Sequence, residues 1–262
     1  TTIGREKREN YAFQPETADE FKEAVMGGMP SAPTYYPELK KVNKAGAGPI
    51  TQLPAGEELD PGTVAARQAE GAMIVDAREK GEVAKGYIPG SVFAGADNNM
   101  TTWMGWLAPY EGDIVLIVDG REEYEQARLM LQRIGLDRVA GYLIGVEGWK
   151  QSGRELDTIG EVTVEQVSEV VGTPGAPIIL DVRSDSEYEE GHIPGAKHHY
   201  AGEITQGDMP NLPKDADIVV VCGSGYRSMV ASTLMKDAGF QKLASMVGGM
   251  EAWNEAKEEV TA

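Results

Sequence analysis

The feature that most constrains the fold of this 262-residue chain is an internal duplication. The sequence Gly-Tyr-Ile-Pro-Gly at residues 86–90 returns as Gly-His-Ile-Pro-Gly at residues 191–195, an offset of 105 (191 minus 86). The apolar run at 113–117 returns at 217–221, an offset of 104 (217 minus 113). Matches in the same order and almost without gaps indicate a duplicated domain of about 100 residues, a common domain size.

The duplication divides the chain into three parts. Residues 51–152 form the first copy of the domain, residues 158–262 form the second, and residues 1–50 precede both as an N-terminal arm. The two copies meet near a polar stretch, residues 151–160, that contains two glycines. Polar, glycine-containing stretches of this kind are typical of domain boundaries.

The N-terminal arm combines a predicted helix with a proline-rich stretch. Residues 16–28 have amphipathic spacing, with Thr17 as a candidate N-cap and acidic residues in the first turn. Residues 29–50 contain four prolines, which predicts an extended segment rather than a core element. Tyr35 and Tyr36 leave two alternatives open, a disordered leader or an arm that packs against another surface.

Within each copy, short apolar runs alternate with segments of helical spacing. In the second copy, residues 176–182 and 217–221 are predicted strands, and residues 163–171, 228–238 and 251–259 are predicted helices. This alternation predicts two α/β domains, each a mainly parallel sheet flanked by helices. Ligands of such sheets bind beyond the carboxyl ends of the strands, where helix N-termini converge.

The charge balance excludes several classes of partner. The chain has 24 Lys and Arg against 42 Asp and Glu, a net charge of −18. Because phosphate contacts need clustered Lys and Arg, we expect no nucleic-acid partner. No apolar run reaches the ~18 residues of a membrane span, and the first residues are polar, so we expect no membrane association and a cytoplasmic protein.

Cysteine and histidine are rare in this chain. Cys222 is the only cysteine, which excludes an intramolecular disulfide and a thiolate metal cluster. His198 and His199 adjoin each other, a poor geometry for chelating one metal, and we expect neither a metal nor another cofactor. His192 lies in the Gly-His-Ile-Pro-Gly turn, and its imidazole is interpreted as holding loop backbone rather than acting as a base.

The predicted strand at 217–221 leads directly into the loop Cys222-Gly223-Ser224-Gly225-Tyr226-Arg227. The glycines let the backbone curl so that successive N–H groups point inward at the start of the next helix, which makes an anion cradle. The helix N-terminus and the fixed charge of Arg227 favour a thiolate, so Cys222 is expected to have a lowered pKa and to be an accessible nucleophile. The alternative is a buried, inert cysteine.

The second copy resembles a rhodanese, a sulfurtransferase domain. The matching residues are Leu180-Asp181-Val182-Arg183, Glu187-Tyr188, Gly191-His192-Ile193-Pro194-Gly195-Ala196, the loop at 222–228, and Gly248-Gly249-Met250 with Trp253. The resemblance implies that Cys222 takes the outer sulfur of thiosulfate or of a low-molecular-weight persulfide and passes it to an acceptor such as sulfite, cyanide or a thiol. It also implies that the N–H groups of the loop bind the donor, with Arg227 facing the anion.

The Asp181–Arg183 pair is interpreted as a strand-end ion pair that braces the loops rather than as a catalytic pair. Loop length separates sulfur transfer from the nearest rival chemistry. Cysteine phosphatases related to this fold place an arginine six positions after the cysteine, whereas Arg227 stands at the fifth position and Ser228 at the sixth. The shorter ring suits a single sulfur atom better than a tetrahedral phosphate, which argues against phosphatase or arsenate reductase activity.

The first copy keeps the frame of the domain but lacks the cysteine. Its corresponding loop reads Val118-Asp119-Gly120-Arg121-Glu122-Glu123-Tyr124. The three carboxylates of this loop would repel an anionic donor. The first copy is therefore expected to be catalytically inactive and to serve as a packing or docking partner. Two non-enzymatic alternatives stay open for the whole chain: a sulfur relay that serves one dedicated partner, and a docking module.

The arm carries a second resemblance. Residues 1–8, Gly28-Met29-Pro30, Tyr35-Tyr36-Pro37 and Lys41-Val42-Asn43 resemble the tail of a metallo-β-lactamase-type persulfide dioxygenase of the kind found fused ahead of rhodanese domains. Three clustered histidines cannot supply the iron site of such an enzyme. The chain is then either the carboxyl-terminal part of such a fusion or the product of a gene that retained only the tail. The resemblance implies a persulfide dioxygenase as a partner.

Overall fold

The structure, a computed structural model, describes residues 1–27, 35–46 and 55–256. The chain separates into two compact units, Thr1–Pro33 and Thr34–Ala262. The first unit contains α1 (Ile3–Glu9), the 3-10 helix η1 (Tyr11–Phe13) and α2 (Ala18–Met26). The predicted helix at 16–28 is confirmed as α2, whose N-cap is Thr17. The Thr17 hydroxyl accepts the N–H of Glu20, and the Glu20 carboxylate accepts the N–H of Thr17.

The predicted extended conformation of residues 29–50 is wrong for Tyr35–Ala45, which form helix α3. Pro37 does not prevent the helix because it lies in the first turn, where the backbone amides have no partner within the helix. The ring of Tyr35 lies against the backbone of Gly105, so a Cβ on this glycine would collide with it. The packed alternative is thus confirmed for Tyr35, whereas Tyr36 is 49% exposed. Residues 28–34 and 47–54 lie outside the described residues.

The first α/β domain holds a five-stranded sheet of order β1-β5-β4-β2-β3 in which every pair is parallel. Its strands are β1 (Glu57–Glu58), β2 (Met73–Asp76), β3 (Val92–Phe93), β4 (Ile114–Val118) and β5 (Val139–Ile144). Its helices are α4 (Pro61–Ala69), α5 (Lys80–Lys85), α6 (Met100–Leu107), α7 (Arg121–Arg133) and α8 (Glu147–Gln151).

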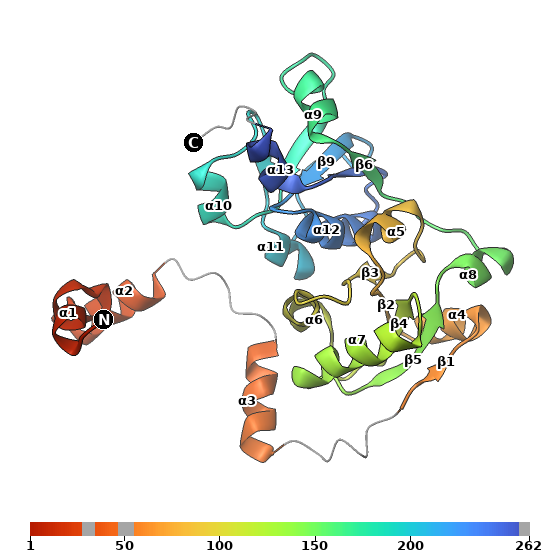
Figure 1. The fold of residues 1–262 in the computed structure, drawn as a ribbon, viewed down its shortest axis with the longest axis horizontal. Helices are drawn as coiled ribbons and strands as arrows, with labels where there is room; N and C mark the ends of the chain where they lie inside the picture. Colours follow the sequence, from red (N-terminus) through yellow and green to blue (C-terminus); the bar gives the residue numbers. More distant parts are fainter. Residues whose placement is uncertain (28–34, 47–54, 257–262) are drawn as a thin grey trace. The chain divides into compact units, whose positions relative to one another are not determined.

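The second domain repeats this topology, with the parallel order β6-β10-β9-β7-β8. Its strands are β6 (Gly160–Val162), β7 (Ile178–Asp181), β8 (Lys197–His198), β9 (Asp217–Val221) and β10 (Lys242–Met246). Its helices are α9 (Val164–Val170), α10 (Asp185–Glu190), α11 (Ala201–Thr205), α12 (Tyr226–Asp237) and α13 (Gly249–Glu255). The predicted fold class, two domains each with a parallel sheet flanked by helices, is confirmed (Figure 1).

Each sheet is buried on both faces because successive side chains of its central strands point to opposite sides. In β9, Val219 and Val221 pack with side chains of α9 and α13, whereas Ile218 and Val220 pack with side chains of α12. Of the described helices, none is long and apolar enough to cross a membrane.

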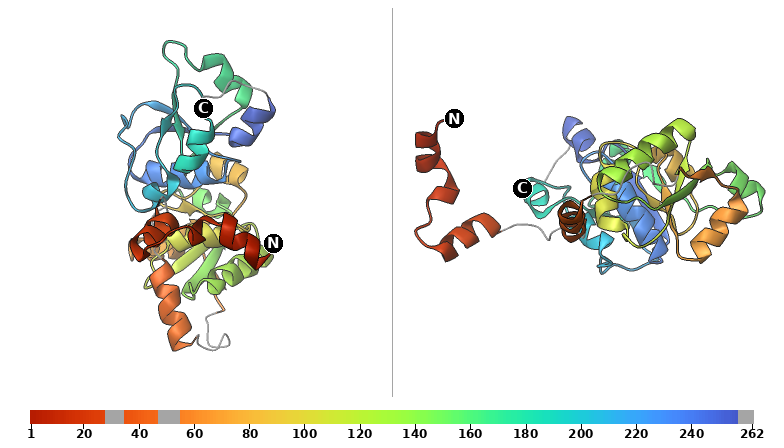
Figure 2. Two further views of the ribbon diagram at one scale, coloured as in Figure 1. Left: turned by 90° about the vertical axis from the view of Figure 1, so that its left-hand side faces the viewer. Right: turned by 90° about the horizontal axis from the view of Figure 1, so that it is seen from below.

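Helix α12, which follows the cysteine loop, is shared between the two domains. It packs on its own sheet and also against β3 and α5 of the first domain (Figure 1 and both views of Figure 2). One cluster of buried side chains joins Met229 and Val230 of α12 with Val83 and Phe93 of the first domain. The start of α12, where the predicted chemistry lies, is therefore close to the first domain.

Candidate active site

The loop that follows β9 curls around the sulfur of Cys222. Strand β9 ends at Val221 and α12 begins at Tyr226, so four residues connect them. Gly225 caps the helix with a φ of +97°, in the left-handed region that favours glycine. This turn points the Gly225 N–H at the sulfur, with 3.2 Å between nitrogen and Sγ. An amide at the N-terminus of a helix thus donates directly to the predicted nucleophile.

Backbone hydrogen bonds from α13 hold the carbonyl groups of the loop. The carbonyl of Cys222 accepts the N–H of Met250 at 2.7 Å, and the carbonyl of Gly223 accepts the N–H of Glu251 at 2.9 Å. Gly249 makes this approach possible, because a Cβ at this position would collide with both carbonyl oxygens. The Gly-Gly-Met sequence quoted for the family resemblance therefore has a direct structural role beneath the cysteine loop.

Two serine hydroxyls lie on the inner side of the loop. Ser228 donates to the Gly225 carbonyl at 3.0 Å and is bonded to Ser245 at 2.7 Å. The sulfur of Cys222 lies 3.7 Å from the Ser228 hydroxyl oxygen. These contacts were not expected from the sequence, because Ser245 lies on β10 and nothing near it in the chain marks it as part of the loop.

The expectation of an accessible sulfur is wrong for this structure, in which Cys222 is only 1% exposed. The loop turns the side chain inward, where it joins the same buried cluster as Val220 and Met229. The Gly225 N–H is the member of the predicted cradle for which the described structure records a hydrogen bond to the sulfur. The binding role of the other loop N–H groups stays a prediction.

Arg227, expected to face an anionic donor, instead pairs with Glu187 of α10. Both terminal nitrogens of the guanidinium bond the carboxylate, each at 2.6 Å. The guanidinium lies over Gly223, since a Cβ on this glycine would be 3.1 Å from Nη2 of Arg227. Sequence reasoning missed this partner, although Glu187 stands in the quoted Glu-Tyr motif and closes a capping box with Ser184.

This ion pair changes the ionisation of both members. Hydrogen bonding to Arg227 is the largest cause of the lowered pKa of Glu187, which falls to about 2. Burial acts to lower the pKa of Arg227, but the hydrogen bonds to Glu187 and the charge of Cys222 outweigh it, so this pKa is raised. The guanidinium therefore remains charged beside the cysteine.

The interpretation of Asp181 and Arg183 as a brace agrees with their geometry. Arg183 donates to the Asp181 carboxylate at 2.7 Å and to the Gly191 carbonyl at 2.7 Å, and both charged side chains are buried. In the first domain, Arg78 makes the matching bonds, to the Asp76 carboxylate at 2.6 Å and to the Gly86 carbonyl at 2.8 Å. A brace found in both copies, with and without a cysteine, serves the scaffold.

The histidines also bind backbone. Nδ1 of His192 lies 2.9 Å from the Tyr188 carbonyl, and its ring stacks on that tyrosine, in agreement with the predicted structural role. His198 and His199 bond two different carbonyl oxygens, those of Arg183 and Asp208. Ligand atoms of His199, Glu203 and Asp208 lie within 4.8 Å of one another, but two of these residues are exposed and such groups are common without a metal.

The corresponding loop of the first domain is shorter. Strand β4 ends at Val118 and α7 begins at Arg121, so two residues connect them instead of four. The carboxylate of Glu123 accepts the Asp119 N–H in this turn. A carboxylate of the domain itself thus uses a loop amide that would otherwise be available to an anion.

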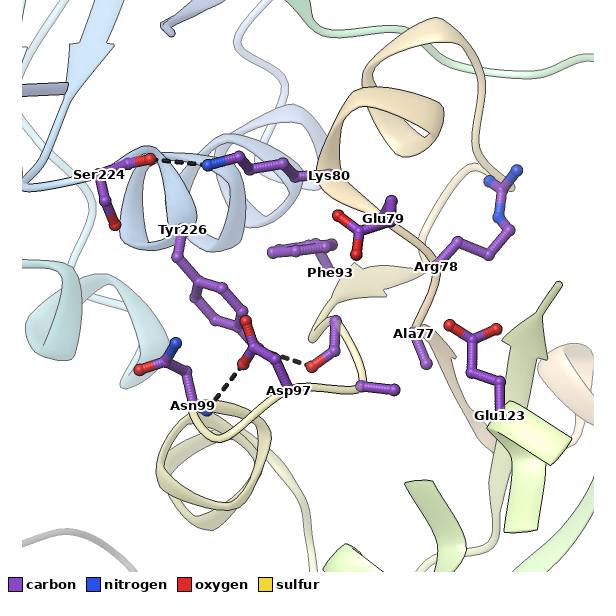
Figure 3. Close-up of a pocket in the computed structure, with 12 residues that line it drawn as sticks. Ala77, Arg78, Glu79, Lys80, Phe93, Asp97, Asn99, Glu123, Ser224 and Tyr226 are labelled. Atoms are coloured by element: carbon purple, nitrogen blue, oxygen red, sulfur yellow. Dashed lines mark hydrogen bonds between the residues drawn. The ribbon is translucent and has the colours of Figure 1, made fainter. Parts of the chain in front are cut away.

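A pocket of about 170 Å³ lies between the two domains (Figure 3). Its walls come from the segments after β2 and β3 of the first domain and from Ser224 and Tyr226 of the cysteine loop. The Tyr226 hydroxyl donates to the Gly95 carbonyl at 3.1 Å. Lys80 also enters this pocket and donates to the Ser224 carbonyl at 2.7 Å (Figure 3). The cysteine loop is therefore in direct contact with the first domain.

The fold and the site define a class of α/β protein in which a strand of a parallel sheet ends at a cysteine whose sulfur accepts an amide N–H at a helix N-terminus. The family model of the Rhodanese-like domain matches residues 60–152 and 163–256. The chain therefore belongs to the rhodanese family and carries two tandem rhodanese-like domains.

Three curated relatives cover parts of the chain. It is 36% identical over 107 residues to "Putative sulfur carrier protein YrkF" of Bacillus subtilis (strain 168), covering 41% of this chain and 57% of that protein. It is 37% identical over 95 residues to "Putative sulfurtransferase YtwF" of the same organism, covering 36% of this chain and 90% of that protein. It is 34% identical over 82 residues to "Thiosulfate sulfurtransferase GlpE" of Pseudoalteromonas translucida (strain TAC 125), covering 31% of this chain and 77% of that protein.

The chain thus spans little more than half the length of the first of these relatives. Two of these relatives are named as sulfurtransferases and one as a sulfur carrier.

Proposed function

We propose that the chain is a sulfurtransferase that moves sulfane sulfur from thiosulfate or a low-molecular-weight persulfide to a thiophilic acceptor through a persulfide on Cys222. The observation that carries the proposal is the Gly225 N–H that donates to the Cys222 sulfur at the start of α12. A donor at this place stabilises a thiolate and then the terminal sulfur of a persulfide. The positive charge of Arg227 beside the loop acts in the same direction.

In the first half-reaction, the Cys222 thiolate attacks the outer sulfur of thiosulfate. A new S–S bond forms to Sγ, the original S–S bond breaks, and sulfite leaves with the electron pair. In the second half-reaction, a thiolate, sulfite or cyanide attacks the outer sulfur of the persulfide, and the Cys222 thiolate leaves. No external oxidant or reductant is needed, since sulfur changes carrier in each step.

Donor binding has to open the closed arrangement around Cys222. Arg227 already binds one carboxylate, and an anionic donor can replace Glu187 as its partner because both offer negatively charged oxygens to the same guanidinium. In this proposal the N–H groups of Gly223, Ser224, Gly225, Tyr226 and Arg227 line the cradle. The first domain, which lacks the cysteine, takes no covalent part.

The proposal is tested by incubating the whole chain with thiosulfate and measuring its intact mass. We expect an adduct of about +32 Da, one sulfur atom, on the native protein and its absence on Cys222→Ser. Because Cys222 is the only cysteine, iodoacetamide labelling reports on this sulfur alone. Full sulfur transfer by Cys222→Ser would refute the proposal, as would a native cysteine that neither accepts sulfur nor reacts with iodoacetamide.

A second candidate is a sulfur relay that passes sulfur to one dedicated partner. It is favoured by the similarity to "Putative sulfur carrier protein YrkF" and by the burial of Cys222. Steady-state turnover separates the two candidates. An enzyme releases sulfur to small acceptors with kcat above ~1 per second, whereas a relay loads Cys222 without release to small thiols.

The proposed partners are a small sulfur donor and a thiol, sulfite or cyanide acceptor. Neither a nucleic acid nor a membrane is proposed as a partner. A persulfide dioxygenase as protein partner is a proposal that rests on the resemblance of the N-terminal arm. A pull-down of such an iron enzyme with this chain tests the proposal. The cytoplasmic location also stays a prediction.

A further inference from the structure

Lys80, the first residue of α5, reaches from the first domain to the cysteine loop of the second. Its ammonium donates to the carbonyl oxygen of Ser224, with 2.7 Å between Nζ and oxygen (Figure 3). This is a charge-assisted hydrogen bond, about twice as strong as one between neutral groups. The domain without a cysteine therefore places a positive charge on the backbone of the loop that holds one.

The Ser224 carbonyl and the Gly225 N–H belong to the same peptide unit. A trans peptide is planar, and its C=O and N–H point in opposite directions. One end of this unit meets Lys80, and the other end donates to the Cys222 sulfur, at 3.2 Å. The peptide plane is thus held at both ends, by an ammonium on one side and by the reacting sulfur on the other.

We propose that Lys80 is a positioning residue for sulfur transfer by the second domain. It orients the Ser224–Gly225 peptide and makes the Gly225 N–H a stronger donor to the Cys222 sulfur. A cation on the carbonyl oxygen draws electron density from the amide nitrogen, and linked hydrogen bonds strengthen one another in this way. The inference rests on the proposed function, and it assigns the first domain a role in the reaction.

The surroundings make Lys80 suited to this role. The two domains are fixed to each other nearby by the bond from Tyr226 to Gly95 and by the Phe93 N–H, which donates to the Thr233 hydroxyl at 3.2 Å. The Lys80 ammonium also lies close to the backbone of Gly225, because a Cβ on this glycine would be 3.2 Å from Nζ.

Other charged groups also lie near the loop. Glu251 lies near Gly223, and Arg227 pairs with Glu187 beside the loop. The wall of the pocket also contains Arg78, Glu79, Asp97 and Glu123. Within the described part of the chain, Lys80 is the cation for which a hydrogen bond to this peptide unit is recorded. Its removal therefore changes the field at one identified amide.

The test compares Lys80→Met, Lys80→Arg and the matched control Lys85→Met in the full chain. Lys85 lies on the same helix and pairs with Glu82 at the surface, so its loss removes the same charge without touching the loop. The readouts are the pH dependence of iodoacetamide labelling of Cys222, thiosulfate turnover, and the ¹⁵N and ¹H shifts of the Gly225 amide.

We expect Lys80→Met to move the labelling midpoint to higher pH, to displace the Gly225 amide resonance, and to slow turnover about tenfold. This loss is smaller than that for deleting a direct anion donor, because Lys80 acts through the amide. Lys80→Arg keeps the charge and the donor, so it should bring all three readouts most of the way back to their native values. If Lys80→Met and Lys85→Met have the same labelling midpoint and the same Gly225 amide shifts, the inference is wrong.

Lys80→Met could act merely by loosening the contact between the two domains. Thr233→Val controls for this, because it removes the hydrogen bond from Phe93 at a place away from the cysteine loop. This variant should lower the melting temperature without moving the labelling midpoint, and an equal movement in both variants would overturn the inference. A native protein without sulfur transfer would refute the proposed function instead. The labelling profile and the amide shift would still decide the role of Lys80.

Discussion

Replacing Glu187 with glutamine removes the carboxylate that binds Arg227 and should destabilise the protein in a pH-dependent manner. Two hydrogen bonds of 2.6 Å join the pair. Hydrogen bonding to Arg227 is the main reason that the pKa of Glu187 falls from its ordinary value of 4.5 to about 2. A group whose pKa is lowered by folding stabilises the folded state at every pH above its unfolded value.

The size of the effect follows from this pKa. A difference of about 2.5 units at 1.36 kcal/mol per unit gives an upper bound of about 3.4 kcal/mol. Because the Glu187 side chain is 36% exposed, solvent screening reduces this value, and we expect about 1–2 kcal/mol. The stabilisation is fully present above about pH 4.5 and is lost as the pH falls through about 2.

The assay is urea unfolding of the native chain and of Glu187→Gln between pH 7 and pH 2.5, followed by circular dichroism. With a slope of about 2–3 kcal/mol per M, the midpoints should differ by about 0.5 M at pH 7 and converge toward pH 2.5. Glu189→Gln, an exposed position on the same helix, is the control and should match the native chain. A difference that stays constant over the whole pH range, or an equal loss in Glu189→Gln, would refute the reasoning.

Two further predictions concern the scaffold beneath the loop. Asp181→Asn breaks a buried ion pair and should lower the free energy of unfolding, measured in urea, by about 3–5 kcal/mol. The control Asp185→Asn changes a side chain that is 87% exposed and should lower it little. Equal losses in the two variants would contradict the role of Asp181 as a brace. Gly249→Ala should lower thiosulfate turnover at least tenfold, because its Cβ meets the Cys222 carbonyl. The control Gly172→Ala has a similar positive φ with open space around it, so unchanged turnover in both variants would show that this contact does not shape the loop.

The elements of this fold were predictable because their signals are local. The strand at 217–221 and the helix after Thr163 follow from apolar runs and caps that need only neighbouring residues. The brace between Asp181 and Arg183 is local as well, since two positions separate its members. The helix at Tyr35–Ala45 was missed because the four prolines of residues 29–50 were counted without their positions, and the one within the helix, Pro37, lies in its first turn.

The closed state of the site depends on tertiary structure. Cys222 is buried because its loop turns the side chain into the cluster that contains Val220 and Met229, and no pattern within the loop shows which way it turns. Arg227 meets Glu187 from 40 positions away, and Lys80 meets Ser224 from 144 positions away. The sequence by itself determined that the single cysteine would lie between the end of a strand and the start of a helix. Only the tertiary structure decided which charges lie near that cysteine: packing within the second domain brings Glu187 to Arg227, and packing between the two domains brings Lys80 to Ser224. The physical reason is that electrostatic partners are set by distance in space rather than along the chain.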